Sequence, residues 1–135
     1  MSINQVLGRW GLYPWWPEDA PSLIHPDDLE ALRAFFAYGK VFHCSGEDPP
    51  FITLVHGSHE FRVKPSLFQP VPTPAYTVGQ SIQLTNGGQL LITECNWHDK
   101  KNAPFFHITL DGKKKSKRYF EEDLRSLIAE TGKGQ

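Results

Sequence analysis

The chain has 135 residues, of which 39% are hydrophobic and 13% aromatic, and its formal net charge is -1. This length favours one domain, or two very small β units that share a core, and the apolar content excludes a disordered chain. The 11 glycines and 11 prolines favour many short strands joined by turns over a helical bundle.

The charge is divided unevenly along the chain. Residues 1–71 carry five Lys or Arg against eight Asp or Glu, a net -3, whereas residues 72–135 carry nine against seven, a net +2. Neither part is charged enough to imply bulk nucleic-acid binding. No signal-like or membrane-length apolar run is present, which predicts a cytoplasmic protein without a membrane partner. We expect Cys44 and Cys95, both inside predicted strands, to be buried thiols.

Residues 1–37 are predicted to form an aromatic arm followed by a helix. Prolines exclude a regular helix in the arm, so it should be extended or irregular. Its rings either cover the core or offer Trp15 and Trp16 to a partner, because Trp and Tyr dominate binding hot spots. Pro26, the acids after it and an apolar stripe then predict a helix over 26–37.

Residues 38–72 are predicted to form a first small β unit. Alternating apolar residues indicate strands at 41–44, 51–56 and 59–64, with a hairpin at Gly57–Ser58. A single helical turn at 65–68 and an edge strand at 69–71 follow. Three histidines, His43, His56 and His59, suggest a conceivable metal site, although solvated hairpin histidines explain them as well. We predict no metal and no cofactor.

Residues 73–135 are predicted to form a second β unit that closes with a helix whose start lies at 120–124, and the whole chain is expected to be one globule. Strands are expected at 78–84, 89–98, 105–110 and 113–119, and Asn86–Gly87 is a strong hairpin signal. Alternation along 89–98 places Cys95 and Trp97 on the face of Leu91, with Ile92 and His98 on the other.

No catalytic motif is present: the chain lacks a nucleophile elbow, a P-loop, a dinucleotide fingerprint, a zinc-protease motif and a Cys-x-x-Cys pair. We therefore predict a protein that is not an enzyme. A small hydrolase that uses His98, Asp99 and neighbouring residues is the alternative in this class.

The run from Lys113 to Arg118 has five cations in six positions. In one interpretation it meets phosphates or an acidic protein, with aromatic neighbours for stacking. In the other it is a charged edge strand that prevents aggregation, and the acids at 121–123 neutralise it. The candidate binding residues of this half are Trp97, His98, Lys113, Lys115, Lys117, Arg118 and Tyr119.

The layout V-G-Q-S-I, N-G-G-Q-L-L-I, W-H and F-F-H-I-T-L-D-G-K-K-K-S-K-R-Y-F-E-E-D-L resembles a small Src-homology-3-like barrel of the Tudor or KOW kind. With G-L-Y-P-W-W-P, H-P-D-D and Y-G-K-V-F, nearly the whole chain resembles an uncharacterised family of small bacterial proteins. The second half also resembles barrel proteins found beside toxin genes, some of them suspected immunity proteins. Fold resemblance alone does not establish a function.

Together these observations predict a mainly β (α+β) chain: an N-terminal helix, two small antiparallel Src-homology-3-like barrel units and a short C-terminal helix. The leading hypothesis is a non-catalytic bacterial interaction protein, with a cognate protein partner that the resemblance suggests is a toxin. The alternative is a nucleic-acid-binding barrel that uses residues 113–118.

Overall fold

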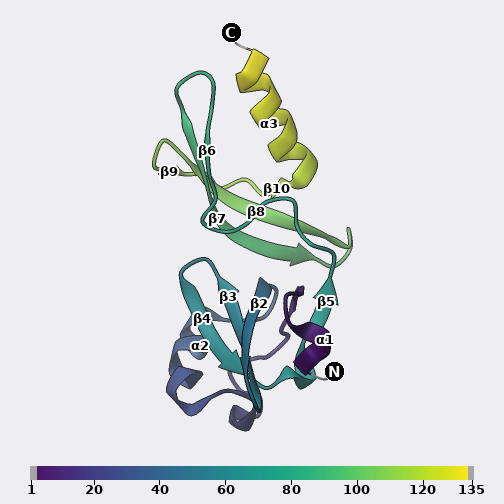
Figure 1. Ribbon diagram of the computed structural model, residues 1–135. Coiled ribbons are helices and arrows are strands. Elements are labelled where there is room, and N and C mark those ends of the chain that lie inside the picture. The colour runs from purple at the N-terminus through teal and green to yellow at the C-terminus, as the bar shows by residue number, and fades with distance from the viewer. Residues whose placement is uncertain (1–2, 134–135) are drawn as a thin grey trace. The chain divides into compact units, whose positions relative to one another are not determined.

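The computed structural model describes residues 3–133, and the chain divides into two units, Met1–Thr73 and Pro74–Gln135 (Figure 1). Each unit is built around one antiparallel sheet. The prediction of a mainly β chain is therefore confirmed, and the two sheets are described separately below.

Five strands form the sheet of the first unit in the order β4-β3-β2-β1-β5, and every neighbouring pair is antiparallel. The strands are β1 (Trp10–Leu12), β2 (Val41–Asp48), β3 (Phe51–His56), β4 (His59–Val63) and β5 (Gln69–Val71). The helices are α1 (Ile3–Val6) and α2 (Leu29–Phe35), with 3-10 turns η1 (Pro21–Leu23), η2 (Pro26–Asp28) and η3 (Pro65–Leu67).

Strand β1 places part of the aromatic arm inside this sheet. It lies between β2 and β5, so the sequence-based boundary at residues 37 and 38 does not separate two parts of the structure. Gly11 allows this close approach, because a Cβ there would lie 2.5 Å from the Phe68 ring and 2.6 Å from the Gln69 carbonyl oxygen. Only glycine fits between these two neighbours without a shift.

The arm also supplies the largest side chains of the first core. Tyr13 and Trp15 are fully buried and pack with residues of α2, β2, β3 and β4. Their polar atoms are satisfied: the Tyr13 hydroxyl donates to the Lys64 carbonyl at 2.7 Å, and Trp15 Nε1 donates to the Ala20 carbonyl at 3.1 Å. Burial raises the pKa of the Tyr13 phenol.

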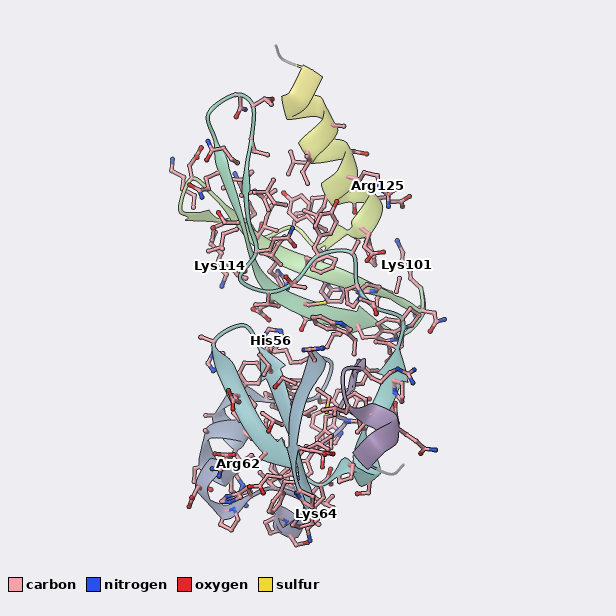
Figure 2. The ribbon with its side chains drawn as sticks, in the orientation of Figure 1. His56, Arg62, Lys64, Lys101, Lys114 and Arg125 are labelled. Carbon is pink, nitrogen blue, oxygen red and sulfur yellow. The ribbon has the colours of Figure 1, made fainter. Side chains whose placement is uncertain are left out.

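The helical segment is shorter than the predicted range of 26–37. Its first turn is the 3-10 turn η2, and α2 ends at Phe35. An ion pair fixes this turn to the sheet: the Asp28 carboxylate accepts hydrogen bonds from the Arg62 backbone N–H at 2.8 Å and from Arg62 Nε at 2.8 Å. Figure 2 shows Arg62 in the first unit, where it belongs to the edge strand β4.

The turn between β2 and β3 contains a cis peptide bond between Pro49 and Pro50.

The sheet of the second unit has the order β10-β8-β7-β6, and β9 also pairs with β8. Its elements are β6 (Ser81–Gln83), β7 (Gln89–His98), β8 (Ala103–Leu110), β9 (Lys113–Lys114), β10 (Tyr119–Phe120) and α3 (Glu121–Lys133). Because β7 occupies one edge of β8 along its length, β9 and β10 share the other edge. The predicted continuous strand over 113–119 is therefore wrong: residues 115–118 form no strand between the short strands β9 and β10.

A bulge in β7 overturns the predicted division of its faces. The register shifts between Ile92 and Glu94, so Thr93 is an extra residue and the alternation changes phase there. Cys95 consequently faces the same side as Ile92, against Phe106, and both are buried. The buried hydrophobic residues of this unit are Leu84, Leu90, Ile92, Cys95, Phe105, Phe106, Ile108 and, from α3, Leu124.

Both sheets are open in their hydrogen bonding over the described residues, because no pairing joins the outer strands of either one. Among residues 3–133, no helix combines the length and the apolar character needed to cross a membrane.

Candidate binding surfaces

The cations of the predicted lysine-rich run have different environments. Lys113 is exposed in β9, whereas Lys115 is half-buried and its N–H donates to the Ile108 carbonyl at 3.1 Å. The Lys117 ammonium lies 5.1 Å from the centre of the Tyr119 ring. Arg118 extends instead over the Phe105 ring, at 4.9 Å from its centre. Lys117 and Arg118 therefore lie against different rings.

Trp97, His98 and Tyr119 do not form a common stacking surface. Trp97 pairs with Pro104 and Tyr119 pairs with Phe106, which places both on the face that carries the buried core. His98 lies on the opposite face, where its Nδ1 accepts a hydrogen bond from the Lys101 N–H at 3.2 Å. The hydrolase hypothesis relied on His98 and Asp99. The hydrogen bond from Lys101 occupies Nδ1 of His98, so this nitrogen serves the turn that follows β7.

A different group of side chains meets on the His98 face, and we call it the cation–ring cluster. Phe105 contacts His98, His107 and Phe120, with ring centres 5.8 to 6.1 Å apart. Two cations cover these rings: the Lys101 ammonium lies 4.3 Å from the centre of Phe120, and Arg118 lies over Phe105. The cluster consists of His98, Lys101, Phe105, His107, Arg118 and Phe120.

An open pocket of about 510 Å³ adjoins this cluster at the start of α3. Figure 2 shows Lys101 and Arg125 on the same side of the second unit, and both line the pocket with Glu121 and Glu122. The Phe120 N–H donates to Asp123 Oδ2 at 2.9 Å, which caps the helix at this point. Acids and cations therefore share the pocket wall.

The two adjacent tryptophans of the arm have opposite environments. Trp15 is a core residue with no exposed surface. It is therefore not available to a partner, which one of the two sequence-based interpretations required. Trp16 is 42% exposed and is the centre of a second group of rings. Tyr38 stacks on it at 4.4 Å between ring centres, and Phe36 meets it edge-on at 5.1 Å. We call Trp16, Phe36 and Tyr38 the aromatic triad.

Each ring of the aromatic triad is about two-fifths exposed, since Phe36 and Tyr38 have 41% of their surface accessible. Phe36 also has a left-handed backbone, with φ at 65° and ψ at 85°, at the residue that ends α2. Glycine is the usual residue in this conformation, and a side chain costs about 1–2 kcal/mol there. Neither burial nor backbone preference accounts for a phenylalanine at this position.

The turn that carries Trp16 is held on both sides. The Asp19 N–H donates to the Trp16 carbonyl at 2.9 Å, and the Trp16 N–H donates to Asp19 Oδ2 at 2.9 Å. Arg33 on α2 donates from Nε to the Pro17 carbonyl at 3.3 Å and also pairs with Glu30. With Trp15 anchored in the core, these contacts hold the backbone of the turn that carries Trp16 in place before any partner binds.

The histidines of the first unit do not gather into a metal site. His43 packs against Trp10 at 4.7 Å between ring centres, whereas His56 and His59 both contact Phe35. Over the described part of the chain, no group of three or more His, Cys, Asp or Glu is placed to hold a metal ion. Cys44 and Cys95 are both buried, as predicted, and burial raises the pKa of each thiol.

Sequence reasoning found Trp16 but missed its partners. The spacing of Phe36 from Leu29 and Leu32 fits the apolar stripe of the predicted helix over 26–37, which predicts a buried Phe36. The signal that could have found the aromatic triad is the missing glycine directly after the helix, where Phe36-Ala37-Tyr38 precedes Gly39.

Comparison with known proteins gives a family without an assigned role. No curated protein and no solved structure matches the chain. Residues 3–125 match the family described as "Family of unknown function (DUF6960)". Since the match covers most of the sequence, including all strands of both sheets, the chain belongs to this family of unknown function.

Proposed function

We propose that this chain is a non-catalytic protein-binding module, and that the aromatic triad is the centre of its contact surface. The observation that carries the proposal is Phe36: an exposed ring kept in a backbone conformation that costs free energy. Residues held in sparsely populated conformations cluster at functional sites. Trp and Tyr, the other members of the triad, are the residue types most enriched in binding hot spots.

A fixed ring surface is also suited to binding. The two hydrogen bonds between Trp16 and Asp19, and the contact from Arg33 to Pro17, order the turn in the free protein. A partner then loses less free energy to the ordering of side chains. The first unit carries a net -3, which supports a protein partner over a nucleic acid at this surface.

We infer a Src-homology-3-like arrangement for residues 10–71 rather than for the second half. The support is the strand order β5-β1-β2-β3-β4, in which β5 returns to β1 after the single 3-10 turn η3. In this reading α2 belongs to the long connection between β1 and β2, and that connection carries the aromatic triad. An experimental structure of the chain tests the inference by its strand pairing.

The finer form of the proposal is immunity: the bound protein is a toxin whose activity the module blocks. The support is the resemblance of the second half to barrel proteins found beside toxin genes, together with a surface built for contact. The test is co-expression of the chain with each toxic product of a neighbouring gene. Rescue of growth by the wild-type chain, and loss of rescue in Trp16→Ala/Tyr38→Ala, is the expected result.

The matched control for this test is Leu7→Ala, which removes an exposed apolar side chain (45% exposed) from the same unit outside the aromatic triad. It should rescue growth like the wild type. If the wild-type chain rescues no neighbour, the immunity proposal is wrong. If the triad variant rescues as well as Leu7→Ala, the triad is not the contact surface.

The cation–ring cluster supports a second function, binding of single-stranded nucleic acid by the second unit. Aromatic rings interleaved with cations are the means by which proteins stack bases and contact phosphates. The second unit has a net +2. We expect Lys101→Glu/Arg118→Glu to weaken binding more than Lys113→Glu/Lys117→Glu in filter assays across a salt series. Undetectable binding at low salt, or equal loss in both variants, contradicts this function.

A further inference from the structure

Acidic side chains border the aromatic triad. Glu18 and Asp19 directly follow Trp16 and Pro17 in the same turn, and both are exposed. One Asp19 oxygen accepts the Trp16 backbone N–H at 2.9 Å, so this carboxylate is held at the backbone of Trp16. Within residues 3–133, neither acid forms an ion pair.

The cations near the triad are already engaged. Arg33 is paired with Glu30 and donates to the Pro17 carbonyl. The Lys40 ammonium lies over the Phe35 ring, 5.7 Å from its centre. Among the described residues of this unit, no cation is therefore paired with Glu18 or Asp19, and their negative charge can attract a cation that approaches Trp16.

We propose that the aromatic triad receives a cationic side chain of its partner, an arginine or a lysine, on the exposed part of the Trp16 ring. Trp is the best cation–π acceptor among the aromatic residues, and nearby carboxylates strengthen such contacts. The partner surface is accordingly basic, which complements the net charge of -3 on this unit. This inference rests on the proposed function, because it names the chemistry of the partner at the same surface.

The stacked geometry limits how the cation binds. Trp16 and Tyr38 lie 4.4 Å apart with 26° between their planes, so no group fits between them. The cation instead contacts the exposed part of Trp16, beside the Phe36 ring, whose plane lies at 84° to that of Trp16. A planar guanidinium fits this arrangement better than an ammonium, because it can stack on the ring and donate to a carboxylate at once.

The test uses the full chain and two synthetic peptides of eight residues. One contains three arginines spaced by Gly and Ser, and the other has neutral citrulline at the same three positions. Binding is followed by NMR through the shift of the Trp16 indole N–H, assigned with Trp16→Leu. We expect the arginine peptide to bind about tenfold more tightly than the citrulline peptide, and to weaken as salt rises.

The acids are tested with Glu18→Gln/Asp19→Asn, in which the Asn side chain retains an oxygen for the Trp16 N–H. We expect this variant to bind the arginine peptide about fivefold more weakly. The control, Glu47→Gln/Asp48→Asn, makes the same change of charge on two exposed residues of β2 in the same unit, and should bind like the wild type.

The outcomes separate this inference from the proposed function. If both peptides bind equally, or both charge variants behave alike, the cation proposal is overturned although the triad remains a protein-binding surface. If Trp16→Leu has no effect on rescue by the full chain, the proposed function fails as well. A dimer of the chain that dissociates on Trp16→Leu would show that a second copy occupies the triad, and would also overturn the proposal.

Discussion

Phe36 combines two costs at one residue. Its backbone has a positive φ, and its ring is exposed although it is one of the largest apolar side chains. The gain is an edge-on contact with Trp16, worth about 0.5–1.5 kcal/mol in favourable aromatic pairs. The free energy gained from the contact and the free energy lost to the strained backbone are of similar size. The Phe36 ring therefore adds little net stability to the fold.

Substitution at Phe36 should therefore separate backbone strain from binding. We expect Phe36→Gly to be more stable than Phe36→Ala by about 1 kcal/mol in urea unfolding, because glycine adopts this conformation without a Cβ penalty. Both variants should lose partner binding, since both lack the ring. Equal stability of the two variants would contradict the strain argument.

Asp28 is the second residue whose role can be tested alone. Its hydrogen bond with the Arg62 side chain is the main cause that lowers its pKa, and a bond from the Arg62 backbone adds to this. A lowered pKa means that the carboxylate stabilises the fold above the ordinary Asp value of about 3.9. This stabilisation is lost as the pH falls through the pKa of the folded state.

We expect Asp28→Asn to lower the free energy of unfolding by about 1–2 kcal/mol at pH 7, as for hydrogen bonds to charged groups. The difference from wild type should shrink as the pH falls toward 3 in urea titrations. Asp27→Asn is the control, because Asp27 is more exposed and lies 3.9 Å from Arg62. A constant difference at every pH would show that Asp28 acts without its charge.

Strand β1 is the element on which the first sheet depends. It joins β2 to β5, and its central residue, Gly11, touches the Phe68 ring and the Gln69 backbone. We expect Gly11→Ala to cost about 2–3 kcal/mol in urea unfolding, because one neighbour is backbone and cannot move aside. Gly46→Ala is the control, since the nearest atom to its added Cβ would be 3.9 Å away. Equal effects would show that β1 has room to shift.

Sequence patterns predicted the hairpins of both sheets, because their turns carry glycine or Asn-Gly and flank alternating strands. They did not predict β1, since three residues around a glycine carry no periodicity of their own. They also missed the break in 113–119, where the lysines fit a strand but only Lys113 and Lys114 are in register with residues of β8.

The candidate site was less predictable than the fold. Exposure of Trp16 and burial of Trp15 depend on which ring the core accepts, and both have the same local sequence of aromatics and prolines. The aromatic triad depends in addition on the left-handed backbone of Phe36, which no periodic pattern encodes. The cation–ring cluster required the phase change at Thr93 to place His98 on the face opposite Ile92.

At the scale of the whole molecule, the two units differ in charge and each contains one buried cysteine. Cys44 belongs to the first unit and Cys95 to the second. Burial raises the pKa of both thiols, so the reactive thiolate is scarce in the folded chain.

Each thiol should therefore report on the opening of its own unit. We expect a thiol reagent at pH 8 to modify both cysteines at least about 100-fold more slowly in native buffer than in concentrated guanidinium. Peptide mapping assigns each rate to Cys44 or Cys95. A cysteine that reacts at the unfolded rate in native buffer would show that its unit lacks the core described above.

The bulge in β7 determines which residue can be deleted from this strand without exchanging its inward and outward faces. Thr93 has no cross-strand partner of its own, whereas Ile92 and Glu94 face Ile108 and His107. Deletion of Thr93 would leave Ile92 and Cys95 facing inward in a regular strand. Deletion of Asn96, three positions later, would shift Trp97 and His98 to exchanged faces. Members of the family that differ in length within this strand should therefore carry the gap at Thr93.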